Sequence, residues 1–173
     1  MKTSSNGLAF IAQWEGFSAT AYMDDEDGWT IGYGTLIDED KEAYLINATI
    51  SESEALELKK KDVAFVESVI RGQVGAPLNQ NQFDALVSLI YNIGSGQFQD
   101  STVRARINNY DTPENIAEAW KRWKKDDGVV VQGLINRRAK EVELFQTQPK
   151  KKTLITALVI AVIILILVLK FRK

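Results

Sequence analysis

Five segments of the chain carry apolar residues every three or four positions, the spacing of one helix face. The first follows N-cap candidates at residues 3–6 and ends near Gly16. The second opens with the capping box Ser51–Glu54, and the fourth opens with Thr112 followed by a first-turn Pro113. The expected apolar faces comprise Leu8, Ile11 and Ala12; Ala55, Leu58, Val63, Val66 and Ile70; Phe83, Leu86, Val87 and Ile90; Ile116, Ala119, Trp120 and Trp123; and a last helix over about residues 134–145.

Residues 20–36 follow a different pattern. Aromatic and β-branched residues flank an acidic turn that ends in Gly28, which is typical of a β-hairpin. The helix that begins at Ser51 is long enough to join two lobes. The next helix, which carries Phe83 to Ile90, is ended by the glycine-containing run 92–96. We therefore expect an α+β fold that is mainly α-helical, with one small sheet near the N-terminus.

The end of the chain is apolar without interruption. Residues 153–169 contain no charge, glycine or proline and would span about 25 Å as a helix, close to the ~30 Å hydrocarbon core of a bilayer. Lys152 and Lys170 could reach the headgroups at either side. We expect a domain of residues 1–148, a basic linker at 149–152, a transmembrane helix at 153–170 and a basic tail at 171–173. The N-terminus shows no signal-peptide pattern, so the expected anchor is C-terminal.

The orientation and location of this anchor stay open. Three basic residues lie on each side of the apolar run, so the positive-inside rule does not choose between the two topologies. The membrane could be an internal virion membrane, serving delivery of the genome, or the inner membrane of a bacterial host until lysis. The anchor has no Gly-xxx-Gly pair, and we expect a monomer.

Composition restricts the available chemistry. The chain has 173 residues with no cysteine and no histidine, which excludes disulfides, thiolate metal sites and histidine-dependent catalysis. The tail after residue 149 holds six of the 21 basic residues and no acid, so residues 1–149 carry 15 basic and 23 acidic side chains, a net charge of −8. Such an acidic domain is a poor nucleic-acid binder, and no nucleic-acid partner is expected.

A pair of carboxylates beside the hairpin is the natural acid–base combination in such a chain. Glu15 lies at a helix end, Asp24 on the first arm of the hairpin and Thr30 on the second, so all three could face one cleft. A solvated glutamate and an ordinary acidic turn are the alternatives. A calcium loop is excluded because its first and last ligand positions would be Met23 and Gly34, and no metal site is expected.

The same segment resembles the active-site signature of phage-type lysozymes, the endolysin muramidases. The resemblance covers about residues 8–146 and its motifs occur in the family's order. They comprise Glu15-Gly16, Tyr22, Asp24, Gly28 and Thr30 to Gly34; Gln82 to Ser88; Asn92 to Phe98; Ser101 to Val103; Trp120 and Trp123; and Gly133-Leu134 with Arg137, Arg138 and Glu141. One departure is Thr35, which stands near the position where many relatives carry a histidine.

The resemblance implies a two-lobed lysozyme-like fold and an N-acetylmuramidase that cleaves the β-1,4 bond between N-acetylmuramic acid and N-acetylglucosamine, with no cofactor. By the family pattern, Glu15 is the general acid, while Asp24 activates a water that Thr30 helps to position. The implied mechanism inverts the anomeric centre. Asp25 competes with Asp24, and only the family spacing favours Asp24.

The resemblance also implies three substrate-site residues and leaves two other functions open. Asn92 and Gly94 correspond to the far cleft wall, and Arg137 corresponds to an arginine that would hold Glu15 by a charge-assisted hydrogen bond. A lytic transglycosylase would need only the glutamate. A non-catalytic, membrane-anchored structural protein of a virion could keep the fold for wall binding; an intact Glu-Asp-Thr set argues against both.

Several aromatic and basic residues are expected to have structural roles. Core positions are expected for Tyr22, Phe83 and Phe98. Trp29 or Tyr33 could stack on a sugar, since both alternate with Thr30 in the hairpin. The run Lys59 to Lys61 is expected to be a solvated helix face.

Overall fold

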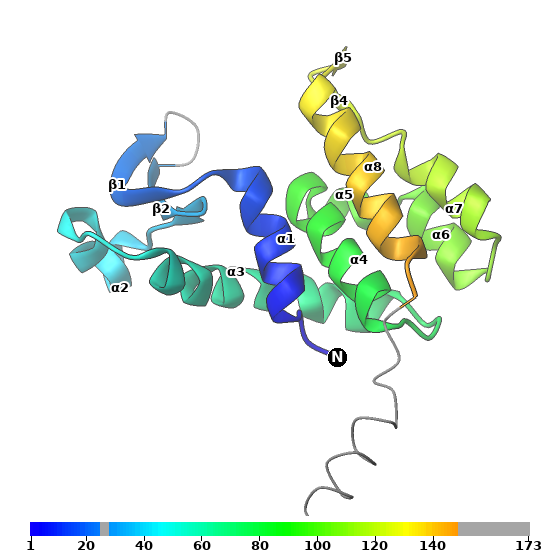
Figure 1. Cartoon of the computed structure of the whole chain (residues 1–173), viewed down its shortest axis with the longest axis horizontal. Coiled ribbons are helices and arrows are strands. Elements are labelled where there is room, and N and C mark those ends of the chain that lie inside the picture. Colours follow the sequence, from blue (N-terminus) through cyan, green and yellow to red (C-terminus); the bar gives the residue numbers. More distant parts are fainter. Residues whose placement is uncertain (25–27, 149–173) are drawn as a thin grey trace, which may run out of the picture.

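A capping box starts the longest helix of the protein, α3 (Glu52–Gln73). In the computed structural model, which describes residues 1–24 and 28–148, the Ser51 hydroxyl accepts from the Glu54 amide while the Glu54 carboxylate accepts from the Ser51 amide. The first turns of α3 bury Ala55 and Leu58 among the residues around the sheet, and its later turns bury Val63, Val66 and Ile70 among the helices. The prediction of a helix joining two lobes is thus confirmed (Figure 1).

The N-terminal lobe is built on three antiparallel strands, β1 (Ser18–Asp24), β2 (Gly28–Gly32) and β3 (Thr35–Leu36), in that order across the sheet. Tyr22 pairs with Thr30, which pairs in turn with Leu36. The short helices α2 (Glu39–Glu42) and η1 (Ala43–Asn47) follow. The predicted hairpin is confirmed, and it gains a third strand. The core of the lobe comprises Ala12, Ile31, Tyr33, Ile37, Leu45, Ile50, Ala55 and Leu58.

The C-terminal lobe surrounds α4 (Gln80–Ile93), whose residues 83–90 are all buried. This helix packs against α1 (Ser5–Glu15), α3 and α8 (Gln132–Gln146), so its apolar side chains have partners on every side. The remaining helices are α5 (Ser95–Gln99), α6 (Thr102–Asn108) and α7 (Pro113–Trp120). Phe83, Phe98 and Trp120 belong to this core, as expected.

Three features of the C-terminal lobe differ from the prediction. Helices α5 and α6 are too short for a helical period to show in the sequence. Helix α7 ends at Trp120, so Trp123 lies beyond the helix and is only partly buried. Strands β4 (Lys125–Asp126) and β5 (Val129–Val130) form a second, two-stranded hairpin around Asp127 and Gly128, both with positive φ. An Asp-Gly pair is a strong hairpin-turn signal and could have revealed it.

The predicted linker, transmembrane helix and basic tail, residues 149–173, lie outside the described residues. Within residues 1–24 and 28–148, no helix combines the length and the apolar character that crossing a bilayer requires.

Candidate active site

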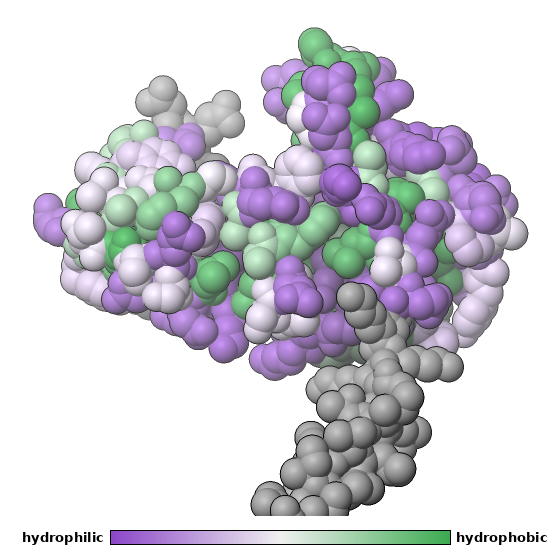
Figure 2. Space-filling view, viewed as in Figure 1, coloured by the Kyte–Doolittle hydropathy of each residue, from purple (hydrophilic) through white to green (hydrophobic). Residues whose placement is uncertain are grey.

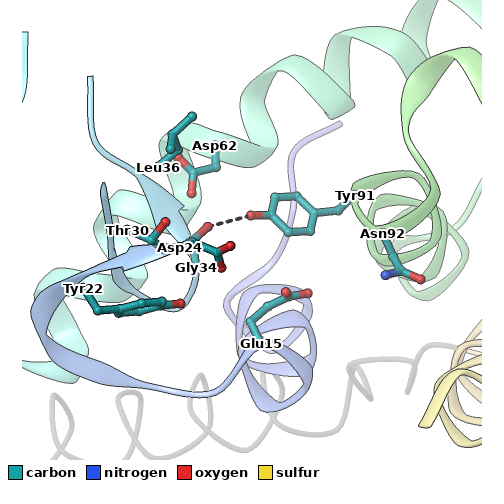
Figure 3. A pocket seen from close by; sticks show the side chains of 9 residues that line it. All are labelled: Glu15, Tyr22, Asp24, Thr30, Gly34, Leu36, Asp62, Tyr91 and Asn92. Carbon is teal, nitrogen blue, oxygen red and sulfur yellow. Dashed lines mark hydrogen bonds between the residues drawn. The ribbon is translucent and has the colours of Figure 1, made fainter. Parts of the chain in front are cut away.

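A cavity of about 630 Å³ lies between the two lobes. Its walls come from the end of α1, the three-stranded sheet, α3 and α4 (Figure 3). The residues that line it are Glu15, Tyr22, Asp24, Thr30, Gly34, Leu36, Asp62, Tyr91 and Asn92. Carboxylates, hydroxyls and an amide dominate this lining, which suits a ligand rich in hydroxyl groups.

The three residues expected to carry the chemistry are brought to this one cavity. Glu15 is the last residue of α1, and Gly16 ends the helix with a φ of 73°, a value that few side-chain-bearing residues adopt. Asp24 is the last residue of β1 and Thr30 lies in the middle of β2. In Figure 3, Asp24 and Thr30 lie on the sheet side of the cavity and Glu15 lies on the side of α1.

Arg137 holds Glu15 from behind the cavity. One guanidinium nitrogen lies 2.9 Å from the Glu15 carboxylate, and the others donate to Glu141 at 3.2 Å and to the Ser88 carbonyl at 3.3 Å. The Arg137 side chain is only 5% exposed and the Glu15 side chain 21%. The expected contact between the two residues is therefore present, and three hydrogen bonds fix the orientation of the arginine.

Behind Arg137 lies a buried charge network centred on Glu141, which is fully buried. Its carboxylate accepts from the Ser88 hydroxyl at 2.7 Å, from the Trp120 indole at 2.8 Å and from Arg138 at 2.8 Å, besides Arg137. A buried carboxylate needs such partners to remain charged. The spacing of Arg137 and Arg138 to Glu141, four and three residues along one helix, was the available signal for this network.

The remaining predicted site residues take different places. Asn92 lines the cavity from the end of α4, whereas neither Gly94 nor Arg137 does. Gly94 ends α4 and starts α5 with a φ of 86°. Trp29 and Tyr33, suggested as stacking residues, do not line the cavity either; Tyr33 donates to Glu52, and burial together with that carboxylate raises the pKa of its phenol.

Two sequence predictions are wrong at the cavity. Tyr22 was expected in the core but is 41% exposed and lines the cavity. Lys59 was expected on a solvated face but is 0% exposed, and its ammonium donates to the Tyr91 hydroxyl and lies 3.2 Å from Asp62. Burial lowers the pKa of Lys59, and the carboxylates of Asp62 and Glu15 partly offset this effect.

A second cavity of about 400 Å³ adjoins the first, since Asn92 lines both. It runs along the C-terminal lobe beside Ile93, Gln97, Trp123, Lys125, Asp126, Val131, Leu134 and Arg138. The hairpin β4–β5 borders it and exposes Val129 and Val130. In Figure 2, hydrophobic surface is visible at the end of the molecule where Figure 1 labels this hairpin. Asn92 thus lies between the two cavities.

No group of three or more metal-ligating side chains occurs in the described part of the chain.

The sequence of the chain matches a known protein family. Residues 12–141 match the sequence model of the Phage lysozyme family. The endolysin of Salmonella phage P22 is 39% identical over 147 residues, covering 84% of this chain and 98% of that protein.

Solved structures agree with this family match. The endolysin from Escherichia coli O157:H7 phage FAHEc1 has a TM-score of 0.75 at 35% identity, covering 87% of this chain and 98% of that one. The muramidase domain of SpmX from Asticaccaulis excentricus has a TM-score of 0.74 at 34% identity, covering 85% of this chain and 99% of that one.

Proposed function

The chain belongs to the phage lysozyme family and is a peptidoglycan-hydrolysing lysozyme, and we propose that it is an N-acetylmuramidase that inverts the anomeric centre. The observation that carries the proposal is the convergence of Glu15, Asp24 and Thr30 on one cavity between the lobes. The scissile bond would be the β-1,4 linkage from N-acetylmuramic acid to N-acetylglucosamine.

The proposed reaction needs one proton donor and one proton acceptor. Glu15 gives its proton to the glycosidic oxygen as the bond to the anomeric carbon breaks. A water on the opposite face of the sugar attacks that carbon, and Asp24 takes the proton that this water loses. Thr30 would hold the water by its hydroxyl, and Arg137 would keep the Glu15 carboxyl in place for the transfer. No metal or cofactor takes part.

Asp24 rather than Asp25 is proposed as the acceptor. Asp24 lines the cavity as the last residue of β1. Asp25 lies outside the described residues, so the choice between the two rests on this placement and on the family spacing.

We further propose that residues 153–170 anchor the protein in a lipid bilayer, either inside a virion or at the inner membrane of the host. The position where the described chain ends supports this arrangement. Asn81, at the start of α4, donates to the Thr147 carbonyl at 2.9 Å, whereas Asn92, at the other end of α4, lines the cavity. The two ends of α4 are roughly 17 Å apart. An anchor attached there would leave the cleft accessible to the wall.

Product chemistry tests the proposed reaction. The full chain would be incubated with purified Gram-negative peptidoglycan, followed by mass spectrometry and NMR of the released muropeptides. We expect products that have gained one water and new reducing ends that appear first as the α-anomer. Products with a 1,6-anhydro ring would identify a lytic transglycosylase, and the β-anomer would identify retention. No product from the folded protein would favour a structural role.

Flotation tests the anchor. The full chain should float with phospholipid vesicles, and a variant with Ile160→Asp and Ile164→Asp in the apolar run should not, because charges at the bilayer centre are costly. Equal flotation of the two proteins would contradict the anchor and leave the proposed reaction untouched.

A further inference from the structure

Lys59 is a buried cation that the proposed reaction does not use. It is fully buried in the middle of α3, and its ammonium lies 4.3 Å from the centre of the Tyr91 ring. Burying an ammonium is costly unless it is paired and hydrogen-bonded. The pairing here consists of the Tyr91 hydroxyl and the Asp62 carboxylate.

Both partners of Lys59 line the cavity, although Lys59 itself does not. Asp62 comes from α3 and Tyr91 from α4, so the Lys59 ammonium contacts one residue from each of two cavity walls. The Tyr91 hydroxyl also donates across the cavity to the Gly34 carbonyl at 3.4 Å, the dashed line in Figure 3. The position of this hydroxyl is therefore fixed by one donor, Lys59, and one acceptor, the Gly34 carbonyl.

The Asp62 carboxylate is oriented in the same way. The Thr35 hydroxyl donates to Oδ2 at 2.7 Å, and Lys59 lies 3.2 Å from the same oxygen. Among the described residues, Oδ1 has no protein partner. The Asp62 side chain is 24% exposed and lines the cavity. A carboxylate held by one oxygen can accept hydroxyl donors at the other.

Charge explains why this arrangement suits a sugar chain. Three carboxylates, from Glu15, Asp24 and Asp62, line the cavity, and within the described part of the chain its lining contains no lysine or arginine. The Lys59 ammonium behind the lining offsets part of that negative charge, and its electrostatic interaction reaches Glu15 as well as Asp62. Hydrogen bonds from neutral hydroxyls to a carboxylate are among the stronger ones.

We propose that Lys59 is a positioning residue for the substrate: its buried ammonium holds Asp62 and Tyr91 so that these two bind hydroxyl groups of the glycan strand. The inference rests on the proposed muramidase function. Lys59 touches no substrate atom and acts through its two partners. Asp62 is the direct sugar ligand of the set.

Steady-state kinetics of the full chain on soluble glycan oligomers of alternating N-acetylglucosamine and N-acetylmuramic acid test the proposal. Lys59→Met and Asp62→Asn should each raise KM about tenfold, the usual effect of losing one hydrogen bond to a charged group. The value of kcat should change much less, because these contacts are made equally in the ground and transition states. Lys60→Met is the matched control, since Lys60 is the next residue of α3 and is exposed.

The double variant Lys59→Met with Asp62→Asn separates positioning from a general structural role. If Lys59 acts through Asp62, the KM of the double variant should exceed that of the worse single variant by less than about twofold. The proposal would be overturned if the rise in KM of the double variant equalled the product of the two single rises. An unchanged KM in a folded Lys59→Met variant would overturn it as well. Should Lys59→Met not fold, Tyr91→Phe removes one of its partners and should also raise KM. A wild type that releases no reducing ends would instead overturn the proposed function, and this inference with it.

Discussion

The guanidinium of Arg137 lies 2.9 Å from the carboxylate of Glu15, although 122 residues separate them in the chain. The contact joins the last helix of the domain, α8, to the end of the first, α1. Because Arg137 is itself held by Glu141 and by the Ser88 carbonyl, the position of Glu15 depends on how α8 packs against α4.

Arg137→Lys should reduce kcat by roughly ten- to a hundredfold, since displacement of a catalytic group by about 1 Å has effects of this size. Lysine keeps the charge but cannot donate in three directions from a planar group. The measurement is kcat on purified peptidoglycan, with circular dichroism to show that the variant is folded. Wild-type kcat in the variant would show that Glu15 needs no such support.

Glu141→Leu should lower the free energy of unfolding by about 3–5 kcal/mol, because it leaves the buried Arg138 without a carboxylate and removes one of the two carboxylates that pair with Arg137. Urea denaturation measures this change. Glu143→Ala is the control on the same helix: Glu143 pairs with Lys140 in solvent, and its loss should change the free energy by less than about 0.5 kcal/mol. Similar effects of the two substitutions would contradict the structural role of Glu141.

Asp24→Asn should lower kcat by at least about a hundredfold, since general-base catalysis contributes 10²–10⁴-fold. Asp25→Asn should change it by much less. Rates of new reducing ends from both variants, at equal amounts of folded protein, decide the matter. If the two results were exchanged, Asp25 would be the residue that activates the water.

The stability of the protein should depend on pH through Lys59. Its pKa lies below the ordinary value of 10.5 because burial disfavours the charge; Asp62 and Glu15 oppose this effect, and Arg137 adds to it. The unfolded chain therefore binds more protons than the folded one between the two pKa values, and the free energy of unfolding rises with pH in that range.

Lys59→Met removes this contribution. The difference in free energy of unfolding between wild type and Lys59→Met, from urea denaturation, should shift in favour of the wild type as the pH rises from neutral towards 10.5. In Lys60→Met the pH dependence should match that of the wild type, because Lys60 is exposed. If the difference in free energy of unfolding stayed constant with pH, folding would not change the pKa of Lys59.

The sequence predicted the parts of the site that depend on local order. The spacing of Glu15, Asp24 and Thr30 places one residue at a helix end and two on adjacent strands, and the structure brings them to one cavity. Glu15 and Asp24 are the last residues of a helix and of a strand, positions that capping and turn signals indicate, and Thr30 lies in the middle of the next strand. The family resemblance, rather than local order, suggested Asn92 and Gly94 for the far cleft wall, and of these two only Asn92 lines the cavity.

The residues whose burial or role was predicted wrongly depend on tertiary contacts instead. Lys59 lies in a run of three lysines, and nothing local shows that α4 covers it with Tyr91. Tyr22 alternates like a core residue, yet its face of β1 opens into the cavity. The helical spacing of Glu141 to Arg137 and Arg138 indicates part of the charge network, but the contacts of Glu141 with Ser88 of α4 and Trp120 of α7 depend on tertiary packing.

The most direct test of the proposed function compares the full chain with its Glu15→Gln variant on purified Gram-negative peptidoglycan, scoring new reducing ends. Glutamine keeps the shape of the side chain and an oxygen that can accept from Arg137, so the variant should fold, but it cannot give a proton to the glycosidic oxygen. We predict clearing and new reducing ends from the wild type, with a loss of at least about a hundredfold in the variant. Comparable rates from the two folded proteins would show that Glu15 is not the general acid.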